Sequence, residues 1–198
     1  MGLWGASDSD ESKPKNLTTA EKKEVFANAS GWVREAGSAL SGNDNTDADP
    51  EVLVAIGELS TSIGAADITE VEMVTTTADK SEGFTISVRV RYNEPVDVVT
   101  TGGTPTLAVT NSNDGTGSGR GPHSLSYASG TGTNELIFSL AIAAANAATN
   151  ADDVLSVGAQ TIALNSGTMK DASGTASDAA LVISGALGTA AGTVTVTA

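Results

Sequence analysis

The stretch FTISVRVRYNEPVDVVTTGGTPTL, residues 84–107, decides the expected fold of this chain. Apolar and polar side chains alternate over Phe84–Asn93, and a period of two is typical of a strand with one face on a core and one in water. Glu94-Pro95 is expected to stop the hydrogen-bond ladder, because proline has no N–H to donate. The alternation resumes over Val96–Val98, and Gly102-Gly103 turns the chain toward the next strand.

The chain from residue 67 onward consists of short apolar runs separated by Gly, Asn, Asp and Ser. Short strands at this spacing, with turn signals between them, predict an all-β fold, an antiparallel β-sandwich of the immunoglobulin (Ig) kind. Ala141–Ala148 has two interpretations, the end of a strand or a helical turn, because alanine leads the helix scale. Further strands are expected at Ile68–Val74, Leu107–Thr110, Ser124–Tyr127, Leu136–Ile142, Val154–Val157, Gln160–Leu164, Met169, Ala180–Ile183 and Val194–Val196.

Composition excludes several classes of function. A net charge of −14 argues against binding to nucleic-acid backbones, which need basic patches. No apolar run approaches the roughly 20 residues of a membrane span, and the absence of cysteine rules out disulfides and thiolate metal sites. The first residues, MGLWGASDSDESKPK, lack the apolar segment of a secretory signal, so none is expected.

Residues 1–66 are expected to form an extended, partly helical N-terminal arm before a β-sandwich domain of residues 67–198. The sequence of Thr18–Glu21 is that of a capping box, which predicts a helix from Ala20 to about Asn28. Such a helix is too short to be stable alone in water, so it should dock on something. The apolar run Glu51–Gly57 is either a strand or a helical turn, because its periodicity fits both.

Apolar side chains in this arm are predicted to anchor the protein on a partner, since binding energy concentrates in a few buried aromatic and apolar residues. Trp4 has a second interpretation, in which it packs back on its own domain, whereas Trp32 is expected to be exposed. The predicted anchoring residues are Leu3, Trp4, Val25, Phe26, Trp32, Val52, Leu53, Val54 and Ile56.

No motif for catalysis, metal binding or cofactor binding stands out. His123 is the one histidine, and an ordinary loop histidine is favoured over a catalytic triad. The glycine-rich segment before it lacks the GK[ST] or GxGxxG pattern of a phosphate loop. The chain is therefore expected to be no enzyme, with no catalytic, cofactor-binding or metal-binding residues. Three acidic clusters lack calcium-loop spacing: Asp8/Asp10/Glu11, Asp44/Asp47/Asp49 and Asp152/Asp153.

Four segments, in their order and spacing, carry a family resemblance: Val88–Val98, Gly103–Leu107, Tyr127–Phe138 and Leu164–Gly174. Together they resemble the bacterial and phage Ig-like domain that is repeated in large surface proteins, over about residues 67–185. Thr175 departs from the asparagine that is usual in the family after this glycine. The resemblance implies a β-sandwich used for display, adhesion or decoration, and it carries no shared catalytic residues.

Two shorter segments, Gly2–Gly5 and Gly42–Asn45 followed by Pro50–Ile56, look similar to virion structural proteins of marine tailed phages. This resemblance implies a capsid decoration or accessory protein, docked on the shell by its arm and found on the particle surface after assembly in the host cytoplasm. The implied partners are the major capsid protein or other virion proteins, and further copies of the chain. The alternative is a tail-fibre or surface adhesin domain that binds a host glycan or protein.

Overall fold

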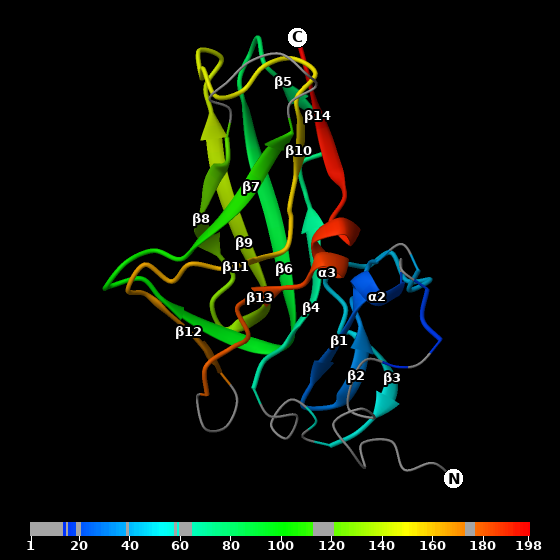
Figure 1. Ribbon diagram of the computed structural model, residues 1–198. Helices are drawn as coiled ribbons and strands as arrows, with labels where there is room; N and C mark the ends of the chain where they lie inside the picture. The colour runs from blue at the N-terminus through cyan, green and yellow to red at the C-terminus, as the bar shows by residue number, and fades with distance from the viewer. Residues whose placement is uncertain are drawn as a thin grey trace.

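The computed structural model describes residues 14, 16–18, 21–38, 40–57, 59, 65–112, 121–172 and 177–198. The regular elements of these residues are nearly all β-strands (Figure 1), which confirms the expected all-β fold. The described elements are α2 (Glu21–Glu24), β1 (Val25–Asn28), β2 (Gly31–Arg34), β3 (Glu51–Ala55), β4 (Ile68–Met73), β5 (Ala78–Asp79), β6 (Phe84–Val99), β7 (Thr106–Ser112), β8 (His123–Ser129), β9 (Thr133–Ile142), β10 (Val154–Ser156), β11 (Gln160–Thr161), β12 (Thr168–Asp171), β13 (Val182–Ile183), α3 (Gly185–Ala190) and β14 (Thr193–Thr197).

Within the described residues, nine strands form one continuous sheet, in the order β12-β6-β9-β8-β7-β10-β14-β5 with β4 also on β6. We call this sheet, with α3 and the β11–β13 pair, the body. The pairings are antiparallel except that of β14 with β5, which is parallel. Buried side chains from β6, β9, β7, β10 and β14 meet in one core, so the sheet folds over on itself like a sandwich.

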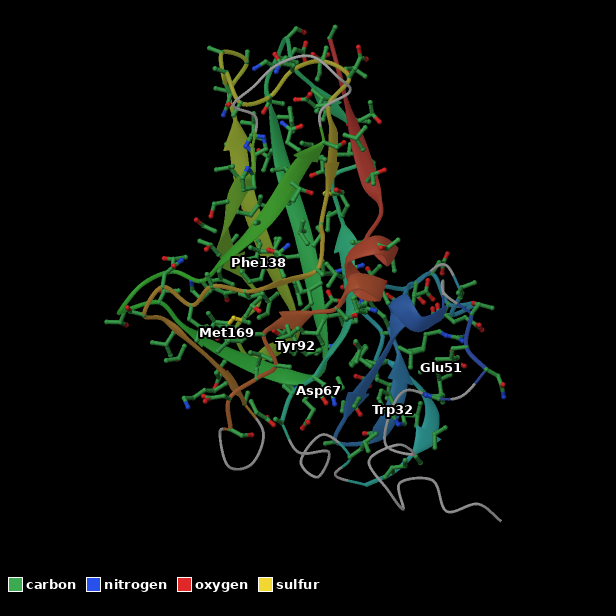
Figure 2. All side chains as sticks on the ribbon, viewed as in Figure 1. Trp32, Glu51, Asp67, Tyr92, Phe138 and Met169 are labelled. Carbon is green, nitrogen blue, oxygen red and sulfur yellow. The ribbon has the colours of Figure 1, made fainter. Side chains whose placement is uncertain are left out.

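The body core is filled by the residues that the alternating pattern places on one face of each strand. Val88, Val90 and Tyr92 point inward from β6, and Phe138 does so from β9. The hydroxyl of Tyr92 donates a hydrogen bond to the carbonyl of Ala180 at 2.9 Å, and burial raises the pKa of this phenol. Tyr92 and Phe138 both lie within the body (Figure 2) and belong to its core.

Strand β6 continues through Glu94-Pro95, where the sequence pattern predicts a stop. The ladder does change at this point, because the register between β6 and β9 shifts between Arg91 and Val96. Before the shift β6 pairs with β4, and after it β6 pairs with β12 through Val96–Val99. Proline therefore ends one set of pairings without ending the strand, and the carbonyl of Pro95 accepts a hydrogen bond from the amide of Ala172.

Two elements of the body are absent from the sequence predictions. Strand β5 has only the residues Ala78–Asp79, too short for a periodic signal, and α3 begins after an N-cap serine, Ser184, whose hydroxyl accepts from the amide of Leu187. The Ala141–Ala148 segment leaves β9 after Ile142 and continues in turns, so the helical interpretation of this segment is wrong.

The N-terminal region is more regular than an extended arm. Strands β1, β2 and β3 form an antiparallel sheet, which we call the N-terminal sheet. The capping box is present, because Thr18 donates to the Glu21 carboxylate from its amide and hydroxyl and its hydroxyl accepts from the Glu21 amide. These bonds lower the pKa of Glu21. However, the helix spans only Glu21–Glu24, and the predicted extension to Asn28 is wrong because Val25–Asn28 form a strand.

The N-terminal sheet lies beside one end of the body, and the C-terminal strand β14 runs toward the other end (Figure 1). Strand β1 lies against β6, so β3 is the strand of this sheet farthest from β6. Ala66 is already part of the body core, one residue before the predicted domain boundary. Among the described residues, no helix has the length and apolar character needed to cross a membrane.

Candidate functional site

The N-terminal sheet has a small core of its own, and part of the predicted anchor set lies inside it. Val25 and Trp32 are fully buried there, together with Ala27 and Leu59. The expectation that Trp32 is exposed is therefore wrong: this tryptophan packs within its own sheet (Figure 2). Both side chains stabilise the sheet, and in this fold they are not available to a partner.

The other anchors divide into two groups. Phe26 is half-buried on the face of β1 opposite Val25. Val52, Leu53, Val54 and Ile56 belong to β3 or follow it directly, and the burial pattern of β3 shows exposed and half-buried side chains only. The structure thus resolves Glu51–Gly57 as a strand rather than a helical turn. Leu3 and Trp4 lie outside the described residues.

Strand β3 is an edge strand with an apolar composition. It pairs with β2 on one side, and among the described residues no strand pairs with its other side. Val52 is 48% exposed, and it lies on this open edge. An edge that no described strand covers can accept another strand through its backbone amides and carbonyls, with the apolar side chains of β3 beside them.

Acidic side chains surround the start of this edge. Asp44, Asp47 and Asp49 are exposed in the loop before β3, and Glu51 begins the strand with a side chain that is 52% exposed. A guanidinium nitrogen of Arg34 lies 3.7 Å from the Glu51 carboxylate, but the same nitrogen donates to a backbone carbonyl of the loop. The edge therefore carries a negative potential.

The N-terminal sheet is attached to the body by a buried arginine. Arg91 lies on the outer face of β6, yet only 1% of its side chain is exposed. Its Nη2 lies 3.2 Å from the Glu35 carboxylate, which follows β2, and it also bonds Glu135 of β9. Glu70 of β4 lies 4.0 Å from Nη1. One guanidinium thus joins three elements of the molecule, and it fixes the sheet relative to the body.

A second arginine extends this charged cluster along the same face of β6. Arg89 forms ion pairs with Glu72 of β4 and, at 3.3 Å, with Glu135 of β9. Its side chain is 25% exposed, so this pair of bonds is more solvated than those of Arg91. The alternating pattern predicts that both arginines face water, but Arg91 is buried and is the one that forms an ion pair with Glu35 of the N-terminal region among the described contacts.

The single histidine belongs to a buried polar group at the far end of the body. His123 is 5% exposed, and its Nε2 lies 2.9 Å from the hydroxyl of the fully buried Thr149. Burial lowers the pKa of His123, the nearby Asp153 opposes this shift, and Lys80 adds to it. Asp153 is itself buried and accepts from the amide of Asn150. These contacts give His123 a packing role.

The acidic clusters do not assemble into a metal site in the part of the chain that the structure describes, where no three His, Asp or Glu side chains are grouped as metal ligands. Asp44, Asp47 and Asp49 line an exposed loop, while Asp152 and Asp153 differ, the first turning outward and the second buried. The Asp8/Asp10/Glu11 cluster lies outside the described residues.

Three residues with structural importance were missed by sequence reasoning: Arg91, Glu35 and Glu135. In the alternating pattern Arg91 is indistinguishable from Arg89, and Glu35 directly follows another charged residue, Arg34. The available signal was the spacing of Arg89 and Arg91, which are two residues apart and therefore lie on the same face of the strand. This spacing does not identify Glu35 and Glu135 as the acids that bind Arg91.

The fold and the site define an all-β protein in which a small sheet with an exposed apolar edge strand is attached to a larger body. No family model, no curated protein and no solved structure matches the chain. A function for this chain is therefore inferred from its geometry and from the resemblances in its sequence.

Proposed function

We propose that this chain is a non-enzymatic structural protein of a phage virion, a capsid decoration or accessory protein that docks through residues 1–66 and displays the body. The observation that carries the proposal is the exposed apolar edge of β3, on a sheet fixed beside the body. The segment that looks similar to virion proteins, Gly42–Asn45 with Pro50–Ile56, coincides with this edge and the loop before it.

The attachment of the sheet to the body supports the same role. A decoration protein has to hold its displayed domain in a defined direction while one end is bound to the shell. Arg91 and its glutamates join the two parts through a buried contact, and β1 packs directly against β6. Docking through the N-terminal sheet would therefore orient the whole body, with the His123 end pointing away from the shell (Figure 1).

The buried ionisable groups support a structural role as well. His123 is engaged by Thr149, and Arg91 is engaged by glutamates of three different elements. Groups used in this way stabilise a fold, whereas a catalytic group has to reach a substrate. The proposed partners are the major capsid protein or other virion proteins, with several copies of this chain on each particle surface, assembled in the host cytoplasm.

Localisation on particles tests the proposal. Virions are purified, the chain is identified by mass spectrometry, and antibody-gold labelling is imaged by electron microscopy. We expect the label on the icosahedral shell. A label confined to the tail tip would favour a tail-fibre or adhesin domain that binds a host glycan or protein. Absence of the chain from purified particles would overturn a virion role altogether.

A further inference from the structure

The free edge of β3 has the backbone geometry needed to accept another strand. In an antiparallel ladder, successive residues direct their amide and carbonyl groups alternately toward one neighbour and the other. Strand β2 uses one of these two sides over Glu51–Ala55. The groups on the other side meet no strand among the described residues, and β3 lies at the outer margin of the N-terminal sheet (Figure 1).

The side chains of β3 suit a partner strand with apolar residues. Val52 and Ala55 are exposed, and Leu53 and Val54 are half-buried beside the core formed by Trp32. In strand addition the backbone bonds supply affinity, and the alternate side chains supply specificity. Val52 offers the largest apolar contact that a new strand would cover, since 48% of it is exposed.

The charges at this edge select the chemistry of the partner. Asp44, Asp47, Asp49 and Glu51 are all exposed at or before the start of β3. An incoming strand is therefore attracted if it carries lysine or arginine beside its apolar residues, and it is repelled if it is acidic. Charge complementarity of this kind also orients the strand, because these four described acids lie at or before the start of β3.

A second copy of the chain fits this edge less well. The whole chain has a net charge of −14, so pairing of two β3 edges brings together two acidic molecules. Charged residues on an edge are a device that opposes self-pairing.

We propose that the β3 edge binds an extended segment of a partner protein by strand addition, the segment having alternating apolar residues flanked by lysine or arginine. The inference rests on the proposed function, in that the partner carrying the segment is a protein of the shell. It goes further by naming the docking strand, the binding mode and the charge of the partner segment. Val52 supplies the apolar contact, and Asp47 and Asp49 supply the charge selection.

A titration of the isolated chain in solution tests whether the β3 edge binds such a segment. The full chain is labelled with ¹⁵N and titrated with a short peptide of alternating valine and threonine that carries a lysine at each end. We expect chemical-shift changes concentrated in β3 and β2, and at least about tenfold weaker binding of the same peptide with terminal glutamates. Absence of shifts in β3 at millimolar lysine peptide would overturn the proposal.

Matched variants assign the effect to the edge. Val52→Asp should abolish peptide binding, and Val182→Asp should leave it unchanged, since Val182 is an exposed valine of β13 in the body. The double variant Asp47→Lys with Asp49→Lys should remove the preference for the lysine peptide, because the two new cations balance the remaining acids Asp44 and Glu51. Circular dichroism confirms that each variant is folded. Equal binding by the Val52 and Val182 variants would overturn the assignment to β3.

Incorporation into particles separates this inference from the proposed function. If the unmodified chain is present on particles and Val52→Asp is incorporated at the same copy number, the strand-addition inference is wrong while the virion role stands. If the chain is absent from particles, the virion role is wrong, and the peptide titration alone decides the edge. Concentration-dependent dimerisation that Val52→Asp abolishes would identify a second copy as the occupant, which would overturn the choice of a basic partner.

Discussion

The body and the N-terminal sheet bury their apolar side chains on different scales. The body core draws on most of its strands, with many valines, leucines and isoleucines and few aromatic residues. The N-terminal sheet has a fully buried set of Val25, Ala27, Trp32 and Leu59, with half-buried neighbours around it. The smaller unit therefore depends on one large side chain and on its attachment to the body, because small cores stabilise little by themselves.

The largest effect is expected from Phe138→Ala in the body. Phe138 is fully buried and meets Tyr127 edge to face at a ring-centroid distance of 6.0 Å. Its truncation leaves a cavity in the shared core and should lower the free energy of unfolding by about 3–5 kcal/mol. Urea denaturation followed by circular dichroism measures the change, and Val182→Ala, an exposed control, should have little effect. A loss below about 1 kcal/mol would mean that the core packing is described wrongly.

Trp32→Ala is expected to act on the N-terminal sheet alone. A truncation of this kind removes about 3–5 kcal/mol, which exceeds what so small a core supplies. Hydrogen exchange should show amides of Val25–Arg34 losing protection while those of β6 and β9 keep theirs. The matched control is Trp32→Phe, since the indole Nε1 of Trp32 has no hydrogen-bond partner among the described residues and its loss breaks no bond. Equal loss of protection in β6 and β9 would show that the two cores unfold as one.

Arg91→Ala should break the attachment between the two regions. Removing the cation leaves the carboxylates of Glu70 and Glu135 without the guanidinium at a partly buried site, which should cost less than the roughly 3–5 kcal/mol of a fully buried pair because solvent screens part of the charge. Glu35→Gln removes only the half-exposed acid, so its cost should stay below about 1 kcal/mol. Denaturation measures both changes. Fluorescence anisotropy of a dye on the N-terminal sheet should report faster local motion in the Arg91 variant, and unchanged anisotropy there would contradict a fixing role.

The smallest effect on stability is expected from the protonation of His123 in the body as the pH falls. Burial lowers the pKa of His123 below its usual value near 6.5, with Asp153 opposing and Lys80 assisting. The unfolded chain therefore binds this proton at a higher pH than the folded chain, so stability is complete above about pH 6.5 and falls as the pH decreases through the folded-state pKa. The melting temperature of the wild type should decline from pH 7 toward pH 5.5, and that of His123→Gln should decline less. Parallel profiles would exclude this histidine as the cause.

The strands of the body were predictable because the signals for them lie within short stretches of sequence. Alternating residues such as those of β6 and β9 report which face is buried, and glycines and asparagines report where the chain turns. Two errors came from interactions beyond that range. Val25–Asn28 follows a genuine capping box, but pairing with β2 outweighs the weak preference of a short segment for helix. Pro95 lies within a strand because its neighbours change pairing partners there.

The candidate site was predictable in part only. The apolar run over β3 was predicted to be a partner surface, and its side chains are exposed or half-buried. Trp32 and Val25 were predicted as anchors as well, but they are buried in the core of their own sheet. A short apolar segment does not reveal whether it packs on itself or on another protein, because both need the same side chains. The role of Arg91 depends on contacts with Glu35 and Glu135, which are distant in sequence, and single-residue patterns carry no signal for such pairs.

The parallel pairing of β14 with β5 has a mechanical consequence. The long strands run between the end of the body beside the N-terminal sheet and the end where β14 finishes (Figure 1). A pulling force between these two ends acts along the strands, so it loads the hydrogen bonds of β14 with β5 and β10 in shear. Bonds loaded in shear must break together, whereas bonds at a peeled edge break one after another. The body is therefore built to resist tension along its long axis better than force applied across it.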